Sequence, residues 1–370
     1  PDIDAAAGLI CGKPVCMAGW GGSHLGVIDL DLRRDAGRWR PAGASVALRA
    51  ADGAPGSAVG PLGARVAAIA RPALHALRDS LRQPLGEIAR PLHSHFALVA
   101  NDPCTQLIAD AQRAHVESAL SGSSWAELPL VSAASAFRTG ADAVDLPPGP
   151  LDRSALSRIY PYPNVIDALL VDGAGLADWL EMAAGLYETL TKGRRDQPLI
   201  RPGFPGFNFD VIAGLEYQID LSRPARFDPY GQLVAPDSRR IVRLECEGRP
   251  VRPSDRFIVA ASSYRSGGGG NYPGLSPERI VLAGTRPAQD ILAEYIRKHG
   301  PHLPPPRPVW SFVPLPGTGA VFETGQGALA HLDAVTDRRL TALGPAGPGL
   351  TRMRLELAPA DACQSDAPSL

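Results

Sequence analysis

Residues 257–274, FIVAASSYRSGGGGNYPG, join an apolar run to a loop in which four glycines lie between two tyrosines. The run from Phe257 to Ser262 predicts a buried strand, because it is short, continuous and followed at once by turn residues. Pro273 restricts Tyr272 to an extended conformation. The glycines therefore end a strand, which argues against an interdomain linker at this position.

The glycine run does not match the two standard phosphate-binding motifs. A dinucleotide fingerprint opens directly into a helix, and a P-loop continues with Lys-Ser or Lys-Thr. Here Asn271-Tyr272-Pro273 follows instead. Two interpretations stay open: a loop whose glycines let a ligand or another segment approach closely, or a purely structural turn.

The bulk composition indicates an ordinary globular protein. The chain has 370 residues, 45% hydrophobic and 20% charged, with a net charge of -1. Such a length favours two domains or one large domain with appendages. The sequence contains no stripe of Lys and Arg residues, so binding to a nucleic acid polymer is not expected. No apolar run approaches the roughly 18 residues that a membrane span needs, so we expect no membrane insertion.

Residues 8–50 are predicted to form β-structure, and a helix is expected to follow. The segments 15–20, 26–32 and 44–50 are apolar or alternating and are separated by Gly-rich turns. Apolar residues recur at helical spacing over 61–82, with an interruption expected near Pro72. This helix would connect two domains.

The rest of the chain mixes strands and helices. Helices are expected at 104–120, after the start signal Asp102-Pro103, at 152–160, with Asp152 as the cap, and at 288–300. A further helix is expected after a turn at Asp172-Gly173, with one packing face formed by Leu176, Trp179, Leu180 and Ala183. Strands are expected within 128–140, 160–173, 214–221, 240–248 and 255–262. This pattern predicts a mixed α/β or α+β fold. Residues 302–310 read as a polyproline-like connector, and 358–370 as disordered.

The pair His93 and His95 resembles a metal-binding pair, because alternate residues of a strand point to the same side. No cluster of acidic residues or cysteines with ligand spacing lies nearby, so we expect a surface or interdomain strand and no metal site. The five cysteines form no CxxC pair. Pairing of Cys11 with Cys16 across a short hairpin in an oxidising compartment stays open.

Two tyrosines lie at rigid or Gly-rich corners beside apolar strands. Tyr162 is in YPYPN and Tyr264 is in SSYRSGGGG. Two such rings could stack a flat base from both faces, although exposed tyrosines in turns are common. Arg138, in AFRTG, lies where a strand enters a turn, and a lone arginine there is more often solvated.

Five segments in order carry a family resemblance: 101–112, 128–140, 160–181, 207–228 and 256–274. Together they resemble the C-terminal domain of the 5′-nucleotidase family, and within it the bacterial periplasmic branch of 2′,3′-cyclic-nucleotide 2′-phosphodiesterase/3′-nucleotidases. The similarity runs from about Pro14 to about Pro316. It implies a remnant of a metallophosphoesterase sandwich over 1–55, a helical connector over 56–95, a nucleoside-binding domain over 96–316 and a Gly/Pro-rich, partly disordered tail over 317–370.

The resemblance also implies roles for single residues. Tyr162 and Tyr264 match the two aromatic positions that sandwich the base, Asn164 matches a polar residue of the same pocket, and Arg138 matches an arginine on the phosphate side. Gly268, Gly269 and Gly270 belong to the loop beside the base. Gly270 stands where relatives carry an Asp that touches the base, so weak discrimination between bases is expected.

The metal-ligand motifs of the family would lie upstream of residues 14–32 and do not occur in this sequence. The resemblance thus implies two divalent metal ions in the intact enzyme, and no metal or catalytic residue in this chain. Expected ligands are nucleosides, 3′-nucleotides and 2′,3′-cyclic nucleotides, with an N-terminal catalytic domain in cis. The expected location is the periplasm, with the signal peptide outside this chain. A stand-alone, non-catalytic nucleotide-binding module is the alternative. A complete enzyme that uses His93 and His95 is least favoured.

Overall fold

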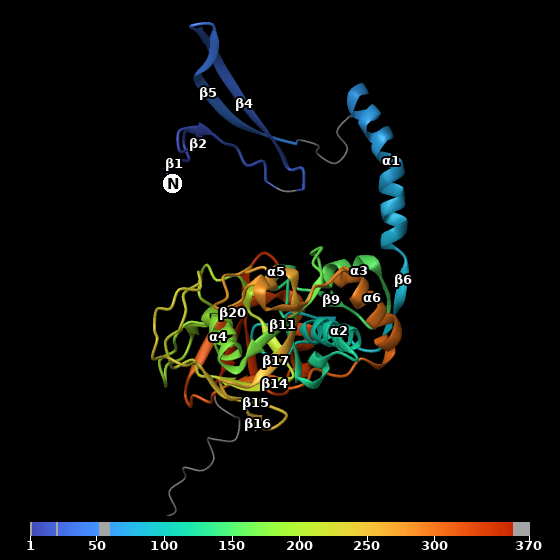
Figure 1. The fold of residues 1–370 in the computed structure, drawn as a ribbon, viewed down its shortest axis with the longest axis vertical. Coiled ribbons are helices and arrows are strands. Elements are labelled where there is room, and N and C mark those ends of the chain that lie inside the picture. Colours follow the sequence, from blue (N-terminus) through green and yellow to red (C-terminus); the bar gives the residue numbers. More distant parts are fainter. Residues whose placement is uncertain (1, 20, 52–59, 358–370) are drawn as a thin grey trace, which may run out of the picture. The chain divides into compact units, whose positions relative to one another are not determined.

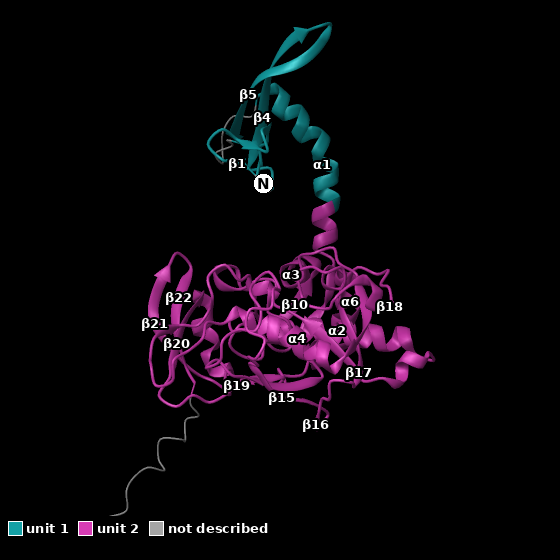
Figure 2. Ribbon diagram, turned by 60° about the vertical axis from the view of Figure 1, so that its left-hand side comes forward, with its two compact units in different colours: residues 1–76 teal, residues 77–370 magenta. Residues whose placement is uncertain are grey.

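The computed structural model describes residues 2–19, 21–51 and 60–357. The chain divides into two compact units, residues 1–76 and 77–370 (Figure 2). The expected disorder of 358–370 lies outside the described residues. The domain boundaries derived from the family resemblance stay predictions.

The first unit contains short strands and one long hairpin. β1 (Ile3–Asp4), β2 (Leu9–Ile10) and β3 (Lys13–Pro14) form an antiparallel sheet, and β4 (His24–Asp35) pairs with β5 (Arg38–Ala50). The strands expected at 26–32 and 44–50 are confirmed within this hairpin. The strand expected at 15–20 is wrong for residues 15–19, which are in neither helix nor strand. Cys11 and Cys16 are both free thiols, so they form no disulfide.

The connecting helix α1 spans Pro61–Leu81 and runs through Pro72 without a break. The expected interruption is therefore wrong. A proline in a helix removes one backbone donor, and the remaining hydrogen bonds on either side can carry the helix past it. No helix among the described residues has the length and apolar character to cross a membrane.

The second unit is built on a nine-stranded mixed sheet (Figure 1). Its path runs β16-β15-β14-β13-β8-β17-β11-β18, with β19 paired to β14. The strands are β8 (Leu130–Ala134), β11 (Ile166–Asp172), β13 (Val211–Ala213), β14 (Leu215–Ile219), β15 (Ile241–Cys246), β16 (Arg249–Pro250), β17 (Arg256–Ser262), β18 (Ile280–Leu282) and β19 (Trp310–Phe312). The predicted mixed fold is confirmed.

β17 is buried on both faces, as its continuous apolar sequence predicts. Ile258 and Ala260 pack with the helices α2 (Pro103–Leu120), α3 (Arg153–Ile159) and α6 (Ala288–His299). Phe257, Val259 and Ala261 pack on the other side with α4 (Gly173–Ala183). The end of β17, where the glycine loop starts, is thus anchored by two hydrophobic cores.

Aspartates fix where three helices begin. The Oδ1 atoms of Asp102, Asp152 and Asp172 accept hydrogen bonds from backbone N–H groups three residues later, at 2.7–2.8 Å. The caps expected at Asp102 and Asp152 are confirmed. The turn expected at Asp172-Gly173 is a helix cap instead: α4 starts at Gly173, and its predicted packing face is fully buried.

The segment after Pro316 is not an irregular tail. It supplies β20 (Gly319–Gly325), β21 (Arg339–Gly347) and β22 (Leu350–Glu356), which form a four-stranded sheet with β12 (Gln197–Pro198). In β22 the side chains of Thr351, Met353 and Leu355 are buried and alternate with more exposed residues. This alternation of period two stabilises the strand, and it is visible in the sequence.

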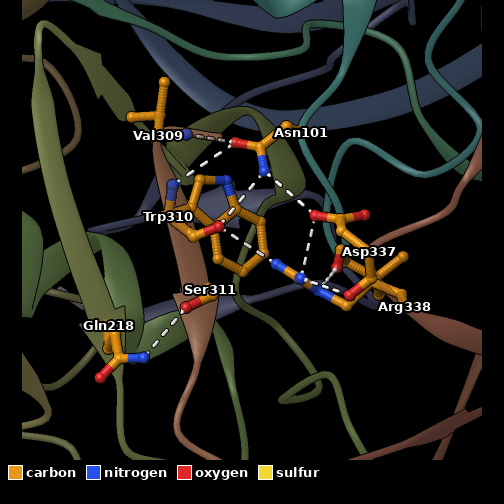
Figure 3. A network of polar contacts seen from close by, with 8 residues as sticks. Asn101, Gln218, Val309, Trp310, Ser311, Asp337 and Arg338 are labelled. Carbon is orange, nitrogen blue, oxygen red and sulfur yellow. Dashed lines mark hydrogen bonds and ion pairs between the residues drawn. The ribbon is translucent and has the colours of Figure 1, made fainter. Parts of the chain in front are cut away.

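Asn101 holds the end of the proline-rich connector against the rest of the second unit (Figure 3). Its Oδ1 accepts hydrogen bonds from the backbone N–H of Val309 at 2.9 Å and of Trp310 at 3.4 Å. Its Nδ2 donates to the carbonyl of Trp310 at 3.2 Å and to Asp337 Oδ2 at 3.4 Å. Arg338 Nη2 also donates to the Trp310 carbonyl, at 3.1 Å. Of the connector expected at 302–310, residues 303–309 are in neither helix nor strand, His302 ends a 3₁₀ helix and Trp310 begins β19.

Two short strand pairs also belong to the second unit. β6 (Pro84–Ile88) pairs with β10 (Gly149–Asp152), and β7 (Leu92–His93) pairs with β9 (Asp145–Leu146).

Candidate functional site

Tyr264 lies on a short helix, α5 (Ser263–Ser266), directly after β17. Ser262 caps this helix, because its Oγ accepts a hydrogen bond from the backbone N–H of Arg265 at 3.4 Å. The ring of Tyr264 is 48% exposed. A Cβ atom at Gly269 would lie 2.6 Å from ring atoms of Tyr264, so only glycine lets the loop fold back against this ring.

Tyr162 lies at a bend shortly before β11 and is 43% exposed. Its ring packs edge-on against Phe137, with centroids 5.3 Å apart, and Phe137 packs in the same way on Tyr160. Asn164 Nδ2 donates to the Tyr160 hydroxyl at 3.3 Å. Burial raises the pKa of Tyr160 to about 12, so this hydroxyl stays protonated at neutral pH.

Tyr162, Asn164 and Tyr264 line one cavity of about 190 Å³. Sites for drug-sized ligands span about 300–1,000 Å³, so this cavity fits a single flat ring system better than a whole nucleotide. The sequence predicted that these three side chains share a site, and the structure brings them to the same cavity.

Further cavity residues were not predicted from the sequence. Phe207 adds another partly exposed aromatic ring, and Gln112, Asp210 and Arg265 add polar groups. Phe207 and Asp210 belong to the sequence FNFD at 207–210, which begins one of the segments that carry the family resemblance but contains no motif of known chemistry. Arg265 follows Tyr264, but its burial could not be inferred from a loop sequence. Gln112 lies on α2 among core residues, where it carries no separate signal.

Arg265 and Asp210 form a buried ion pair in the wall of the cavity. Arg265 Nε lies 2.8 Å from Asp210 Oδ2, and both side chains are 5% exposed. Burial opposes the charged guanidinium, yet the Asp210 carboxylate raises the pKa of Arg265 above its ordinary value. Trp179 Nε1 donates to the same carboxylate at 2.8 Å. Because the two charges neutralise each other, the cavity suits an uncharged ring.

Gln112 presents an unused acceptor at the cavity. Its side chain is 1% exposed, and its Oε1 has no hydrogen-bond partner in the described part of the chain. An unpaired buried amide oxygen costs roughly 1–3 kcal/mol. A ring that carries an N–H donor would remove this cost.

Arg138 and the three glycines do not line the cavity. Arg138 follows the cavity residue Phe137, and its buried Nε lacks a partner among the described residues. Gly268 and Gly270 have φ angles of 90° and 80°. A Cβ at Gly270 would collide with the Arg265 guanidinium and lie 2.8 Å from Asn208 Oδ1. Gly269 and Gly270 let Tyr264, Arg265 and Asn208 approach the loop closely, whereas a Cβ at Gly268 would meet no atom within 4 Å. A role of the three glycines beside a ligand stays a prediction.

The expected surface position of His93 and His95 is also wrong, since the residues are only 6% and 7% exposed. Asp145 and His331 join them. His95 Nε2 lies 3.1 Å from Asp145 Oδ2, and His331 Nε2 lies 3.0 Å from Asp145 Oδ1. His95, Asp145 and His331 are the three residues in the described ranges whose donor atoms lie within 4.8 Å of one another. Three ligands do not fit the pair of metal ions that the family resemblance implies.

A larger cavity of about 610 Å³ lies beside α2 and the proline-rich connector. Asp102, Asp110, Asp333 and Asp337 are among its lining residues. Its lining also includes His93 and Phe96, but these two rings pack edge to face against each other, with centroids 5.9 Å apart. Its acidic lining does not suit a nucleotide, so the smaller cavity is the candidate site.

Comparisons with known proteins agree with this fold. The family model for the 5′-nucleotidase, C-terminal domain, matches residues 86–277. The chain is 32% identical to the trifunctional nucleotide phosphoesterase protein YfkN of Bacillus subtilis, over 89% of this chain and 23% of that protein. It is 33% identical to the 2′,3′-cyclic-nucleotide 2′-phosphodiesterase/3′-nucleotidase of Haemophilus influenzae, over 88% of this chain and 52% of that protein.

A solved structure from Staphylococcus aureus, of a protein classed among the 5′-nucleotidases, superposes with a TM-score of 0.54 at 17% identity. The superposition covers 76% of this chain and 49% of the Staphylococcus aureus chain, and this likeness supports the fold alone. The chain thus spans about half the length of the Haemophilus relative, and less of the Bacillus one. On the family match over residues 86–277, the chain belongs to the 5′-nucleotidase C-terminal domain family.

Proposed function

We propose that this chain is the nucleoside-binding part of a metal-dependent phosphoric ester hydrolase of the 2′,3′-cyclic-nucleotide 2′-phosphodiesterase/3′-nucleotidase type. The base would stack between Tyr162 and Tyr264. The observation that supports this most is the single cavity that both tyrosines line, together with Asn164. The names of the Bacillus and Haemophilus relatives suggest the substrate class.

The packing around each tyrosine supports a stacking role. Phe137 backs the Tyr162 ring, and the backbone at Gly269 backs the Tyr264 ring, so each ring keeps a limited part of its surface for a ligand. Rings that are held before binding lose little conformational entropy when a base arrives. Stacking tolerates different bases, because every base has a π face. Gln112 and Asn164 would supply the few polar contacts.

The phosphate would lie outside the neutral cavity, on the side of Arg138. The Arg138 carbonyl accepts a hydrogen bond from Ser94 Oγ at 2.5 Å, which fixes the backbone there. The Arg138 Nε is buried without a partner in the described structure, so a phosphate oxygen would accept a hydrogen bond from it.

Hydrolysis would take place in a catalytic domain that binds two divalent metal ions, the metal domain typical of this family. Such ions activate water and stabilise charge on the attacking and leaving oxygens. The present chain would contribute binding energy and orientation through the base. The periplasmic location and the presence of the catalytic domain in cis stay predictions. A stand-alone nucleotide-binding module is the alternative.

Calorimetric titration of the chain with adenosine, 3′-AMP and ribose tests this function. We expect adenosine and 3′-AMP to bind and ribose to give no heat of binding, because the base provides the stacking surface. Phosphate release is measured in parallel with Mn²⁺, Co²⁺ or Zn²⁺ present. Equal binding of ribose and adenosine would contradict the base site. Metal-dependent phosphate release by this chain alone would contradict its non-catalytic role.

A further inference from the structure

His95, Asp145 and His331 form a cluster that the proposed nucleotide-binding function does not use. They come from three distant parts of the second unit: the turn after β7, the start of β9, and the 3₁₀ helix Gln326–Ala334. We propose that this cluster is a mononuclear site for a divalent transition metal, with Zn²⁺ as the best match, and that the ion ties these three segments together.

The donor set favours zinc over a hard cation. Two imidazole Nε2 atoms and one carboxylate form a set typical of zinc sites that keep an open position for water. Magnesium and calcium prefer oxygen ligands alone. Around a tetrahedral ion with Zn–N and Zn–O bonds of about 2.0–2.1 Å, neighbouring donor atoms lie about 3.3 Å apart. The two His–Asp separations of 3.1 and 3.0 Å end on different oxygens of Asp145, Oδ2 and Oδ1. The ligand atoms of the three residues lie within 4.8 Å of one another, so an ion between them would draw the two imidazoles closer together.

The backbone holds the three ligands in place. His93 pairs with Asp145 in the β7–β9 register, which sets the carboxylate beside the histidine segment. Ser94 Oγ accepts a hydrogen bond from the Val144 N–H at 2.8 Å. The His95 carbonyl accepts one from Thr324 Oγ1 at 2.7 Å, and this contact links the ligand turn to β20. A metal ion would therefore meet ligands that are already positioned.

Gly327 leaves space directly in front of two donor atoms. A Cβ at this position would lie 2.7 Å from both Asp145 Oδ2 and His95 Nε2. The φ angle of Gly327 is not in the left-handed region, so its backbone conformation does not require glycine. A side chain at position 327 would instead fill the open volume beside Asp145 Oδ2 and His95 Nε2. Access from solvent is through Asp145, whose side chain is 39% exposed, whereas that of His95 is 4% exposed.

The test is calorimetric titration of the untagged, chelator-treated chain with Zn²⁺. Cys11 and Cys16 are replaced by serine in every variant, because free thiols also bind zinc. We expect one equivalent of Zn²⁺ to bind and the melting temperature of the second unit to rise. Co²⁺ in place of Zn²⁺ should give the visible absorption of a four-coordinate site without thiolate bands. Mg²⁺ should not compete.

Three variants locate the site. Asp145→Asn and His331→Ala each remove a ligand, and each should weaken Zn²⁺ binding by more than about 100-fold. Gly327→Ala keeps all three ligands and should also weaken binding, because its Cβ occupies the open space. His302→Ala, at an exposed histidine outside the cluster, is the matched control and should bind like the parent. Circular dichroism checks that each variant is folded.

Either of two results would overturn the proposal: no zinc binding by the parent chain, or unchanged zinc binding in both Asp145→Asn and Gly327→Ala. Nucleoside binding is measured on the same samples. Because no ligand of the cluster lines the base cavity, failure of the zinc site leaves the nucleoside site untouched, and the two proposals fail separately.

Discussion

Arg265 contacts both carboxylate oxygens of Asp210: its Nη2 donates a hydrogen bond to Oδ1 at 2.8 Å, and its Nε forms an ion-pair contact with Oδ2 at 2.8 Å. The pair joins the glycine loop to the FNFD segment. Arg265 Nη1 also donates to the Gly269 carbonyl at 2.6 Å. The guanidinium carbon lies 4.1 Å from the centroid of the Tyr272 ring. The same arginine thus supports both the loop that carries Tyr264 and the segment that carries Phe207.

Replacing Arg265 by Met should strongly destabilise the second unit. The change leaves the Asp210 carboxylate buried without its cation, which costs about 3–5 kcal/mol. Urea unfolding measures the loss of unfolding free energy. Arg286→Met is the control: Arg286 pairs with Glu294 at 2.7 Å, but both side chains are about half exposed, so about 1 kcal/mol or less is expected. Equal losses in the two variants would contradict the structural role of the buried pair.

The tyrosine clamp is tested by Tyr162→Ala and Tyr264→Ala. Each change should cost about 1–3 kcal/mol of adenosine binding, or about 5- to 150-fold in Kd, because one stacking face is lost. Tyr→Phe at either position should retain most of the affinity, since the ring remains. Tyr230→Ala removes an exposed tyrosine that does not line the cavity and serves as the control. Calorimetry gives the Kd values; unchanged affinity in both alanine variants would rule out the clamp.

Local signals in the sequence located much of the fold and part of the site. The run Phe257–Ser262 predicted a strand buried on both faces, and Asp102 and Asp152 predicted helix starts. Each depends on neighbouring residues alone. Tyr162 and Tyr264 could be paired because both follow or precede apolar strands at rigid corners, and β11 and β17 are hydrogen-bonded neighbours.

Contacts between distant residues could not be predicted in this way. Asp210 and Arg265 are 55 residues apart, and Asp145 and His331 are 186 apart. Only the folded chain brings them together, so His93 and His95 lacked acidic partners when judged by spacing. The strand β22 is different, because its alternation of buried and more exposed residues is visible in the sequence. The nearby glycines and prolines nevertheless favoured the prediction of a partly disordered tail.

Asp102 should make the second unit less stable as pH rises. Burial raises the pKa of this carboxyl to about 7, compared with about 3.9 in an unfolded chain. Between these values the folded state holds a proton that the unfolded state has lost, so stability from this group is full below about pH 4 and is lost as pH rises through 7. Asp102→Asn keeps the helix cap without titrating.

The measurement is urea unfolding at several pH values between 4.5 and 7.5, followed by fluorescence of the buried Trp179. The slope of unfolding free energy against pH should be less negative in Asp102→Asn than in the parent chain. Asp152→Asn is the matched control, because Asp152 caps α3 in the same way and is only partly buried. An identical slope in the parent and in Asp102→Asn would show that Asp102 does not titrate in this range.

Gly270→Asp restores the residue that the family resemblance places in the loop beside the base. Here it should destabilise the second unit and leave base preference unchanged, because its Cβ would collide with Arg265.

Gly268→Asp is the matched control: Gly268 has a similar positive φ, but a Cβ there meets no atom within 4 Å. Both variants carry the backbone cost of about 1–2 kcal/mol, so the difference between them isolates the collision. We expect Gly270→Asp to lose more unfolding free energy than Gly268→Asp and to weaken adenosine binding through displacement of Arg265. If Gly270→Asp were as stable as Gly268→Asp and gained a preference for one base, the loop would have room for the acid, and the rigid packing of Arg265 against Gly270 would be wrong.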